Sequence, residues 1–412
     1  MALLIAANLL LALWWHQRAG APRRPTRLLL VTIDCLRDDY MRDASKATYV
    51  SNALALSRQG VSFERAYAQC DRTSFATACL LHSRFMSDGG SWPSLPEQLQ
   101  RRGYATAAFL SSYVMLASGR FSLSTGFDTF DCPRADAGAE WRPAEATTDV
   151  ALQWMASHKR DPHWFLWVMF WDIHQATSLI TAGAAAPSSY PSTYDAGAAA
   201  SDRALGRLMK GLAETGQDDD TLVVLTANHG FSENAQDDAL TEGLLHVPLV
   251  MRAPRWLGEP RRVSTPAMHV DVAPTALSTL DVPGEGGSGQ VLMSALDPER
   301  PVFAETPEQA GRCVIRNGWQ LVEYVRDFTV HRRINGVDQF VVRKRSQTRE
   351  LFELSKDSNG KHDVIAAHRD VADALQQALS AWTARPGAVP PPPPMPTPDA
   401  AMQKALRKHG YW

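Results

Sequence analysis

The chain has 412 residues, a formal net charge of −2 and 45% hydrophobic residues, which suits one large α/β domain with a smaller appendage. A nearly neutral, mixed surface gives no case for a nucleic-acid partner. The five cysteines have irregular spacing and match neither a disulfide framework nor a zinc motif. Cys70 and Cys79 are therefore interpreted as small buried residues, with pairing outside the cytoplasm as the alternative.

An apolar segment, MALLIAANLLLALWW, occupies residues 1–15. It is shorter than the roughly 20 residues that span a bilayer, and its basic residues follow the apolar run, whereas a secretory signal carries them in front. We interpret residues 1–24 as a short membrane anchor, or the remnant of a longer membrane region, with a linker. A cleaved signal and a buried core helix are the alternatives. The anchor predicts membrane association with the folded domain outside the cytoplasm, and the signal predicts a secreted or periplasmic protein.

Helices and strands alternate over the next part of the chain. The hydrophobic pattern predicts helices over 52–59, 94–102, 145–158 and 195–214. Apolar, β-favouring runs predict strands over 28–33, 61–63, 104–110, 164–171, 221–226 and 247–251. Strands that alternate with helices indicate a large, mostly parallel sheet sandwiched by helices.

Polar side chains stand at the ends of two of these strands. Asp34 follows the run 28–33, and the pair Asn228 and His229 follows 221–226. In open α/β sheets, ligands bind at the carboxyl edge of the strands. The chain has no glycine-rich nucleotide loop after Asp34, so an acid there is suited to holding a divalent cation. A helix-capping aspartate is the alternative.

The composition and hydrophobic pattern of the sequence change after Pro283. The segment GEGGSG, residues 284–289, predicts a flexible connection, and 312–354 contains several short strands in succession. These strands predict a small, mostly antiparallel α+β subdomain over 300–385, backed by a helix over 365–382. Residues 386–412 form a proline-rich tail, and its polyproline run favours an extended conformation. The main domain then covers 25–285.

Several motifs, taken together and in order, resemble the sulfatase branch of the alkaline-phosphatase-like superfamily. They are TIDCLRDD (32–39), SNALALSRQGVSF (51–63), FWDIH (170–174), ANHG (227–230), HVPLVMRAP (246–254), DVAPT (271–275), RNGWQLV (316–322), LFELSKD (351–357) and LRKHGY (406–411). This resemblance implies an alkaline-phosphatase-like α/β fold and a metal-dependent hydrolase or transferase. Its substrate would be a sulfate, phosphate or phosphonate ester, borne by a small molecule, a glycan or a lipid.

The resemblance also implies which residue is the nucleophile. Aligning Leu80 to Arg84 with the family's L-L-T-G-R places Thr73 at the nucleophile position. Sulfatases need a cysteine or serine there that is converted to an aldehyde, whereas a threonine resembles the branches that cleave or transfer phosphate and phosphonate esters. A threonine hydroxyl becomes a competent nucleophile when a metal lowers its pKa. A helix N-cap at Thr73 is compatible with this role.

By the same resemblance, a divalent cation (Ca²⁺, Mg²⁺, Mn²⁺ or Zn²⁺) would be bound by Asp34, Thr73, Asn228 and His229. His174 would contact the substrate or protonate the leaving group. The residues expected to contact substrate are His174, Thr77 and His246.

The chain departs from the family pattern at several of these positions. The metal-binding aspartate is Asn228, the basic residue four positions after the nucleophile is Thr77, and a common histidine is Met169. Each change removes a ligand or a positive charge from an anion site. The alternative to the enzyme is therefore a catalytically weak or inactive relative with a binding or scaffolding role at a membrane surface or elsewhere.

Overall fold

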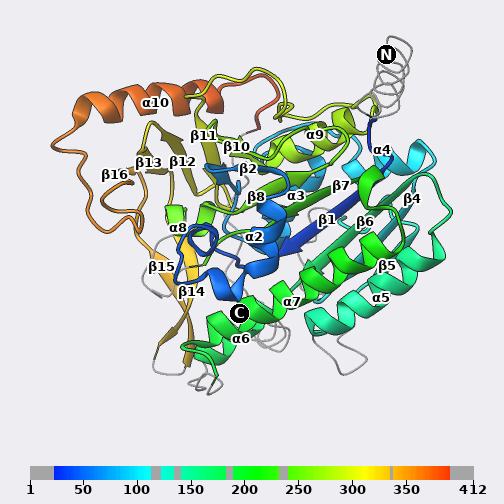
Figure 1. The fold of residues 1–412 in the computed structure, drawn as a ribbon. Helices are drawn as coiled ribbons and strands as arrows, with labels where there is room; N and C mark the ends of the chain where they lie inside the picture. The colour runs from blue at the N-terminus through cyan, green and yellow to red at the C-terminus, as the bar shows by residue number, and fades with distance from the viewer. Residues whose placement is uncertain are drawn as a thin grey trace, which may run out of the picture.

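The computed structural model describes residues 23–112, 122–133, 141–181, 189–231, 240–334 and 337–389. The centre of the fold is an eight-stranded sheet with the order β5-β4-β6-β1-β7-β8-β2-β9 (Figure 1). Its strands are β1 (Arg27–Ile33), β2 (Val61–Phe63), β4 (Ala105–Leu110), β5 (Thr129–Asp131), β6 (Trp164–Phe170), β7 (Thr221–Thr226), β8 (Leu249–Arg252) and β9 (Arg261–Val263). Most neighbours are parallel, and β8 is antiparallel to both β7 and β2. The predicted mostly parallel sheet is confirmed.

Helices cover both faces of this sheet, as the alternation of buried side chains along β1 requires. Leu28 and Leu30 belong to one apolar cluster, and Leu29 and Val31 belong to the other. One face is covered by α5 (Ala144–Ser157) and α7 (Thr193–Glu214), and the opposite face by α3 (Thr73–His82), α4 (Leu95–Arg101) and α9 (Val272–Thr279) (Figure 1). Strands that are buried on both faces read as continuous apolar runs, which explains the sequence of β6.

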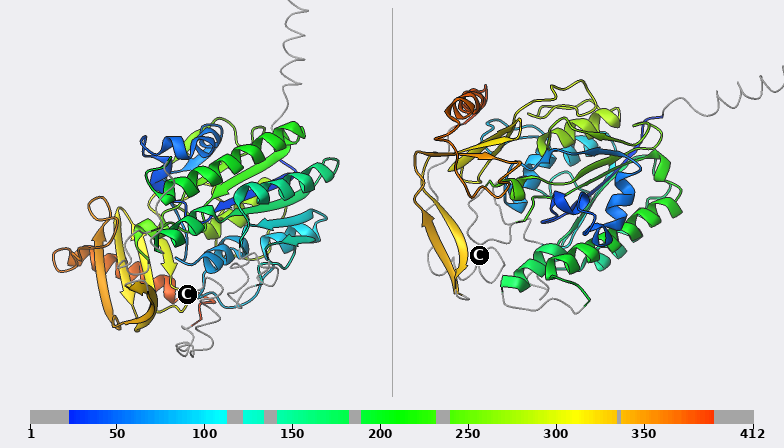
Figure 2. Two further views of the ribbon diagram at one scale, coloured as in Figure 1. Left: turned by 90° about the horizontal axis from the view of Figure 1, so that it is seen from below. Right: turned by 60° about the vertical axis from the view of Figure 1, so that its left-hand side comes forward.

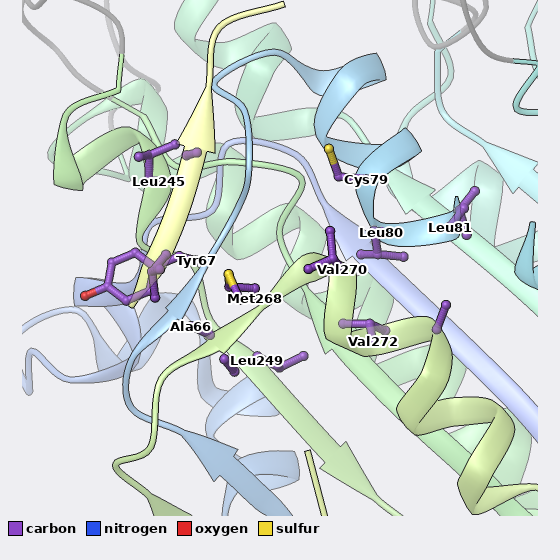
Figure 3. Close-up of a cluster of buried hydrophobic side chains, with 14 of the residues drawn as sticks. Ala66, Tyr67, Cys79, Leu80, Leu81, Leu245, Leu249, Met268, Val270 and Val272 are labelled. Carbon is purple, nitrogen blue, oxygen red and sulfur yellow. The ribbon is translucent and has the colours of Figure 1, made fainter. Parts of the chain in front are cut away.

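The core between the sheet and α3 is shown in Figure 3. Leu80 and Leu81 of α3 pack near Val270 and Val272, while Leu249 of β8 lies beneath them. Burying each such aliphatic side chain contributes about 1.5–3 kcal/mol relative to leaving it exposed. This packing fixes α3, and therefore its first residue Thr73, against the sheet.

Polar side chains attach α2 (Ser51–Ser57) to α7. The carboxylate of Asp202 in α7 accepts hydrogen bonds from the backbone N–H groups of Asn52 and Ala53, each at 2.9 Å, and from the Asn52 side chain. These N–H groups lie in the first turn of α2, where they have no partner within the helix. The Ser-Asn pair that begins this sequence motif therefore has a structural role.

The C-terminal part forms a second, antiparallel sheet with the order β11-β12-β13-β16. Its strands are β11 (Val302–Glu305), β12 (Gly311–Arg316), β13 (Trp319–Tyr324) and β16 (Thr348–Glu353). The helix α10 (Arg369–Thr383) packs on β12 and β13, and β14 (Phe328–Ile334) pairs with β15 (Val337–Arg343) in a separate ribbon (Figure 2). The predicted antiparallel subdomain is confirmed.

The segment 284–289 differs from its prediction as a flexible connection. The backbone N–H of Ser288 donates to the carbonyl of Ser83 at 2.6 Å, and that of Gly289 donates to the Ser83 hydroxyl at 3.1 Å. A Cβ atom on Gly289 would lie 1.8 Å from the carbonyl oxygen of Val270. The glycine is therefore required by close packing against the main domain, which composition alone does not reveal.

Three further sequence predictions concern the N-terminal apolar segment, the C-terminal tail and two cysteines. The apolar segment 1–15 and most of the tail 386–412 lie outside the described residues. Within the described residues, no helix has the length and apolar character needed to cross a membrane. Cys70 and Cys79 are both buried and both free.

Candidate active site

The carboxyl ends of β1, β6 and β7 carry the predicted site residues, and these three strands are neighbours in the sheet. Asp34 follows β1, His174 lies in the first turn of α6 (Asp172–Thr181) just after β6, and His229 follows β7. The Asp34 Oδ2 atom lies 3.1 Å from Nδ1 of His174, and the Asp34 Oδ1 atom lies 3.8 Å from Nε2 of His229. The structure therefore brings these residues together at one edge of the sheet.

A turn held by Tyr194 positions the end of β1. Cys35 adopts a left-handed backbone conformation with φ of 62°, which is uncommon for a residue other than glycine. The Tyr194 hydroxyl in α7 donates to the Cys35 carbonyl at 2.7 Å and accepts from the Arg37 backbone N–H at 2.9 Å. Because both bonds are buried or partly buried, Tyr194 holds the turn that directs Asp34 into the site.

Thr73 is the first residue of α3, and its side chain does not cap the helix, since the N-cap position belongs to Arg72. The Thr73 hydroxyl instead lies 3.0 Å from Nε2 of His229. Nδ1 of His229 lies 2.7 Å from the Gly230 carbonyl, which can only accept, so Nδ1 carries the hydrogen. When the imidazole of His229 is neutral, Nε2 is an acceptor and the Thr73 hydroxyl donates to it.

The backbone after α3 agrees with the register that places Thr73 at the nucleophile position. Ser83, which aligns with the glycine of the family's L-L-T-G-R, has φ of 50° and ψ of 46°. This left-handed conformation is the one that favours glycine at the end of a helix. A shift of the register by one residue would remove this agreement.

Thr77 orients the amide of Asn228. The Thr77 hydroxyl donates to the carbonyl of Thr73 at 2.7 Å and accepts from Nδ2 of Asn228 at 2.5 Å. Because the hydroxyl hydrogen is already donated, the NH₂ group of Asn228 must face Thr77. Its carbonyl oxygen Oδ1 therefore points the other way. Thr77 was expected to contact substrate, and in the structure its hydroxyl is engaged in placing Asn228.

Two buried oxygens of the site accept no hydrogen bond from any described residue: Oδ1 of Asp34 and Oδ1 of Asn228. Both side chains are buried, and a buried acceptor without a partner costs about 1–3 kcal/mol. Burial by itself would raise the pKa of Asp34, but His229, His174 and the Cys35 thiol outweigh it and hold that pKa below its usual value. An ionised carboxylate with an unused oxygen fits a divalent cation.

His174 has the exposure that contact with a substrate requires. Its side chain is 31% exposed, whereas Asp34 is fully buried. The ring stacks on Trp171 with centroids 3.9 Å apart. The preceding acid of the motif, Asp172, accepts the backbone N–H of Ala144 at 2.9 Å, at the first residue of α5. The aspartate of this motif is therefore structural, and the histidine faces the site.

His246 lies in different surroundings. Its ring stacks on Tyr67 with centroids 4.8 Å apart, and its Nε2 donates to the carbonyl of Glu64 at 3.0 Å. It also lies 3.7 Å from Asp38 and 3.3 Å from Glu242. His246, Tyr67 and Glu242 line a pocket of about 280 Å³, which Val302 and Ile315 of the C-terminal sheet also line. No hydrogen bond or ion pair among the described residues joins His246 directly to Asp34, Thr73 or His229.

Two residues of the site were missed by the sequence analysis. The Cys35 thiol lies 3.3 Å from Oδ2 of Asp34 and 3.6 Å from Nδ1 of His174. Burial and the neighbouring His229 lower the pKa of His269 to about 3, so His269 is neutral behind the site. The one sequence signal for Cys35 is its position directly after the acid at the strand end, and His269 has no local signal.

The chain resembles proteins of one family in sequence and in structure. The sulfatase family model matches residues 26–282. Arylsulfatase K of Danio rerio is 29% identical over 193 residues, which cover 45% of this chain and 36% of that protein. Inner membrane protein YejM of Salmonella typhimurium is 25% identical over 186 residues, covering 44% of this chain and 29% of that protein.

The fold also matches the phosphonate monoester hydrolase of Agrobacterium radiobacter, with a TM-score of 0.65 and 18% identity over 88% of this chain and 96% of that chain. The sequence matches span only about a third of the length of the curated relatives. The family match covers more than half of this chain. The chain belongs to the sulfatase family, within the alkaline-phosphatase-like superfamily.

Proposed function

We propose that this protein hydrolyses or transfers an anionic ester, a phosphate, phosphonate or sulfate, with Thr73 as the nucleophile. The observation that carries the proposal is the hydrogen bond between the Thr73 hydroxyl and Nε2 of His229, together with the buried Oδ1 atoms of Asp34 and Asn228, which accept no hydrogen bond from the described residues. A nucleophile, a group that can take its proton and an anionic ligand set then stand at one sheet edge.

The side chain of Thr73 favours phosphorus over sulfur as the centre that is attacked. Attack by the hydroxyl oxygen forms an ester of Thr73 and expels the alcohol of the substrate. A sulfate ester of threonine has no aldehyde hydrate through which to expel sulfate. A phosphoryl or phosphonyl ester can instead be cleaved at phosphorus by water or by an acceptor alcohol. We therefore expect phosphate and phosphonate esters to react faster than sulfate esters.

The described residues supply the other roles. Asp34 and His174 are hydrogen-bonded, so an ionised Asp34 orients the imidazole of His174 by accepting from its Nδ1. The partly exposed ring of His174 can then give a proton to the departing alcohol oxygen. The N-terminus of α3 begins at Thr73, and its backbone N–H groups favour a bound anion there.

We propose that a divalent cation is held by Asp34, Asn228, His229 and Thr73. The Oδ1 atoms of Asp34 and Asn228, which accept no hydrogen bond within the described part of the chain, support this ligand set. Bound there, the metal would lower the pKa of the Thr73 hydroxyl and attract the oxygens of the ester. Since Nε2 of His229 has one lone pair, it can accept the Thr73 proton or bind the cation, but not both at once.

The substrate and location follow by analogy. We propose a small-molecule, glycan or lipid ester, reached outside the cytoplasm by a domain over 25–285 that carries the site, with 300–385 as a second subdomain. YejM is named an inner membrane protein, and this likeness together with the apolar segment 1–15 supports association with a membrane through the N-terminus. The cationic lining of the pocket beside His246 supports a role for that residue in binding an anionic part of the substrate.

The test is turnover of p-nitrophenyl phosphate, phenylphosphonate and sulfate by the purified full chain, with divalent metals added in turn. Thr73→Ala should abolish turnover, while Thr73→Ser keeps a hydroxyl and should retain it. The matched control is Cys79→Ala, because Cys79 is a buried residue on the same helix. Undiminished turnover in Thr73→Ala would overturn the assignment of the nucleophile.

A second candidate function is binding of an anionic ester without turnover. The observation that favours it is the engagement of Thr77 with Asn228, in place of a basic residue with an aspartate. The site then lacks one carboxylate and one positive charge of the family pattern. Under this alternative, p-nitrophenyl esters bind and compete with one another for the site. The slow background rate of p-nitrophenol release is then the same in wild type and in the Thr73 variants.

A further inference from the structure

The thiol of Cys35 is placed beside the proposed metal ligands by its backbone. Cys35 directly follows Asp34 and holds a left-handed conformation, φ 62°, that the Tyr194 hydroxyl fixes by donating to the Cys35 carbonyl. The side chain is buried, and its sulfur lies 3.3 Å from Oδ2 of Asp34. A strained residue that is fixed at a site edge is a common feature of functional sites.

Ligand atoms of Asp34, Cys35 and His229 all lie within 4.8 Å of one another. A cysteine by itself would not make a metal site. The second observation is the pair of buried oxygens, Oδ1 of Asp34 and Oδ1 of Asn228, that accept no hydrogen bond from the described residues. The orientation of the second oxygen is fixed, because Thr77 binds the NH₂ group of Asn228.

We infer that Cys35 is a ligand of the metal and that the site selects Zn²⁺ over Mg²⁺ and Ca²⁺. This inference rests on the proposed function, since it names the ion for the same site. The donor set would then comprise one thiolate sulfur, one imidazole nitrogen, one carboxylate oxygen and one amide oxygen, with the Thr73 hydroxyl as a fifth donor that zinc can accept by expanding its coordination. Zinc is commonly four-coordinate with sulfur, nitrogen and oxygen ligands, whereas Mg²⁺ and Ca²⁺ require six or more oxygens.

The charge of the ligand set supports the same ion. With Asn at position 228, Asp34 is the one carboxylate among the proposed ligands. A bound metal would take the Cys35 sulfur as a thiolate, with the thiol proton released to solvent, so the set would gain a second negative charge. The thiolate thus replaces the charge that the amide of Asn228 does not bring, and a soft ligand favours a borderline ion.

The test uses Co²⁺ as an optical probe of the full chain and competition with Zn²⁺ to measure affinity. Wild type should show a thiolate-to-cobalt charge-transfer band in the near ultraviolet. Cys35→Ser should lose this band and bind Zn²⁺ at least tenfold more weakly. Cys79→Ala, which removes another buried thiol, should keep both. Melting curves without metal show whether each variant is folded.

Three results would overturn the inference: a cobalt band that persists in Cys35→Ser, bound Co²⁺ without a band in wild type, or Mg²⁺ or Ca²⁺ binding as tightly as Zn²⁺. Failure to bind any of these metals would also overturn it. Turnover is measured separately. A band without turnover leaves Cys35 a ligand and removes the proposed catalysis, and turnover that depends on Thr73 without a band removes only the Cys35 ligand.

Discussion

Replacing Asn228 by Asp should destabilise the metal-free protein and increase the stabilisation that bound metal provides. In the wild type, Nδ2 of Asn228 donates to the Thr77 hydroxyl, which itself donates to the Thr73 carbonyl. A carboxylate at position 228 has no hydrogen to donate. Thr77 must then turn its hydrogen to the new carboxylate, and a second negative charge is buried beside Asp34.

The magnitude follows from these contacts. Losing the amide donor and burying a further charge should lower the free energy of unfolding of the metal-free protein by about 1–3 kcal/mol. A third negative charge among the proposed ligands should strengthen cation binding. At a metal concentration of about 100 times the dissociation constant, bound metal stabilises the folded state by about 2.7 kcal/mol. Asn228→Asp should therefore melt below wild type without metal and show the larger rise when metal is added.

The assay is thermal melting over a series of Mg²⁺, Ca²⁺ and Zn²⁺ concentrations, with Asn228→Ala as the control that removes the amide without adding charge. The control should melt lower than wild type and gain less from metal. Equal metal-dependent shifts in wild type, Asn228→Asp and Asn228→Ala would refute the reasoning, because Oδ1 of Asn228 would then not be a ligand. A gain in metal affinity without turnover would favour the binding function.

Three further predictions follow from other parts of the chain. Tyr194→Phe removes two hydrogen bonds from the turn at Cys35. Urea unfolding should therefore show a free energy of unfolding lower by about 1–3 kcal/mol, and a metal titration should show weaker binding. Unchanged metal affinity would mean that the turn holds without this hydroxyl. Burial raises the pKa of Glu305 to about 7, so its stabilising contribution is present below about pH 4.5 and is lost as the pH rises through 7; Glu305→Gln should flatten the fall in melting temperature between pH 4.5 and 7, and a parallel pair of curves would contradict this. The full chain should sediment with membranes and a chain starting near Pro25 should not, and a full chain that stays in the supernatant at high salt would exclude the anchor.

The main sheet was predictable because the hydrophobic pattern of its strands agrees with their burial in the fold. The apolar run of β6 is buried on both faces, and β7 ends at residue 226 as the sequence indicated. The sequence did not specify that β8 pairs antiparallel with β7, because chain direction in a sheet is set by the path of the connection. Nor did composition reveal that Gly289 is packed against Val270, since close packing and flexibility both favour glycine.

The candidate site was predictable where residues follow strand ends, and less so where contacts are made across the fold. Asp34, Thr73, His174 and His229 were named from motifs and lie together. Thr77 was expected at the substrate, but a helical spacing of four from Thr73 turns its hydroxyl to the Thr73 carbonyl and to Asn228. Cys35 was overlooked because the direction of its side chain depends on a left-handed backbone turn, which the sequence of the strand does not indicate.

The central claim is that Thr73 attacks the ester, and a covalent adduct tests it most directly. The full chain is incubated with zinc and a slowly reacting phosphonate ester, quenched in acid, digested and mapped by mass spectrometry. We predict a phosphonyl group on the peptide that contains Thr73, absent from Thr73→Ala and present in Cys79→Ala. An adduct on another residue, or one that persists in Thr73→Ala, would contradict the account.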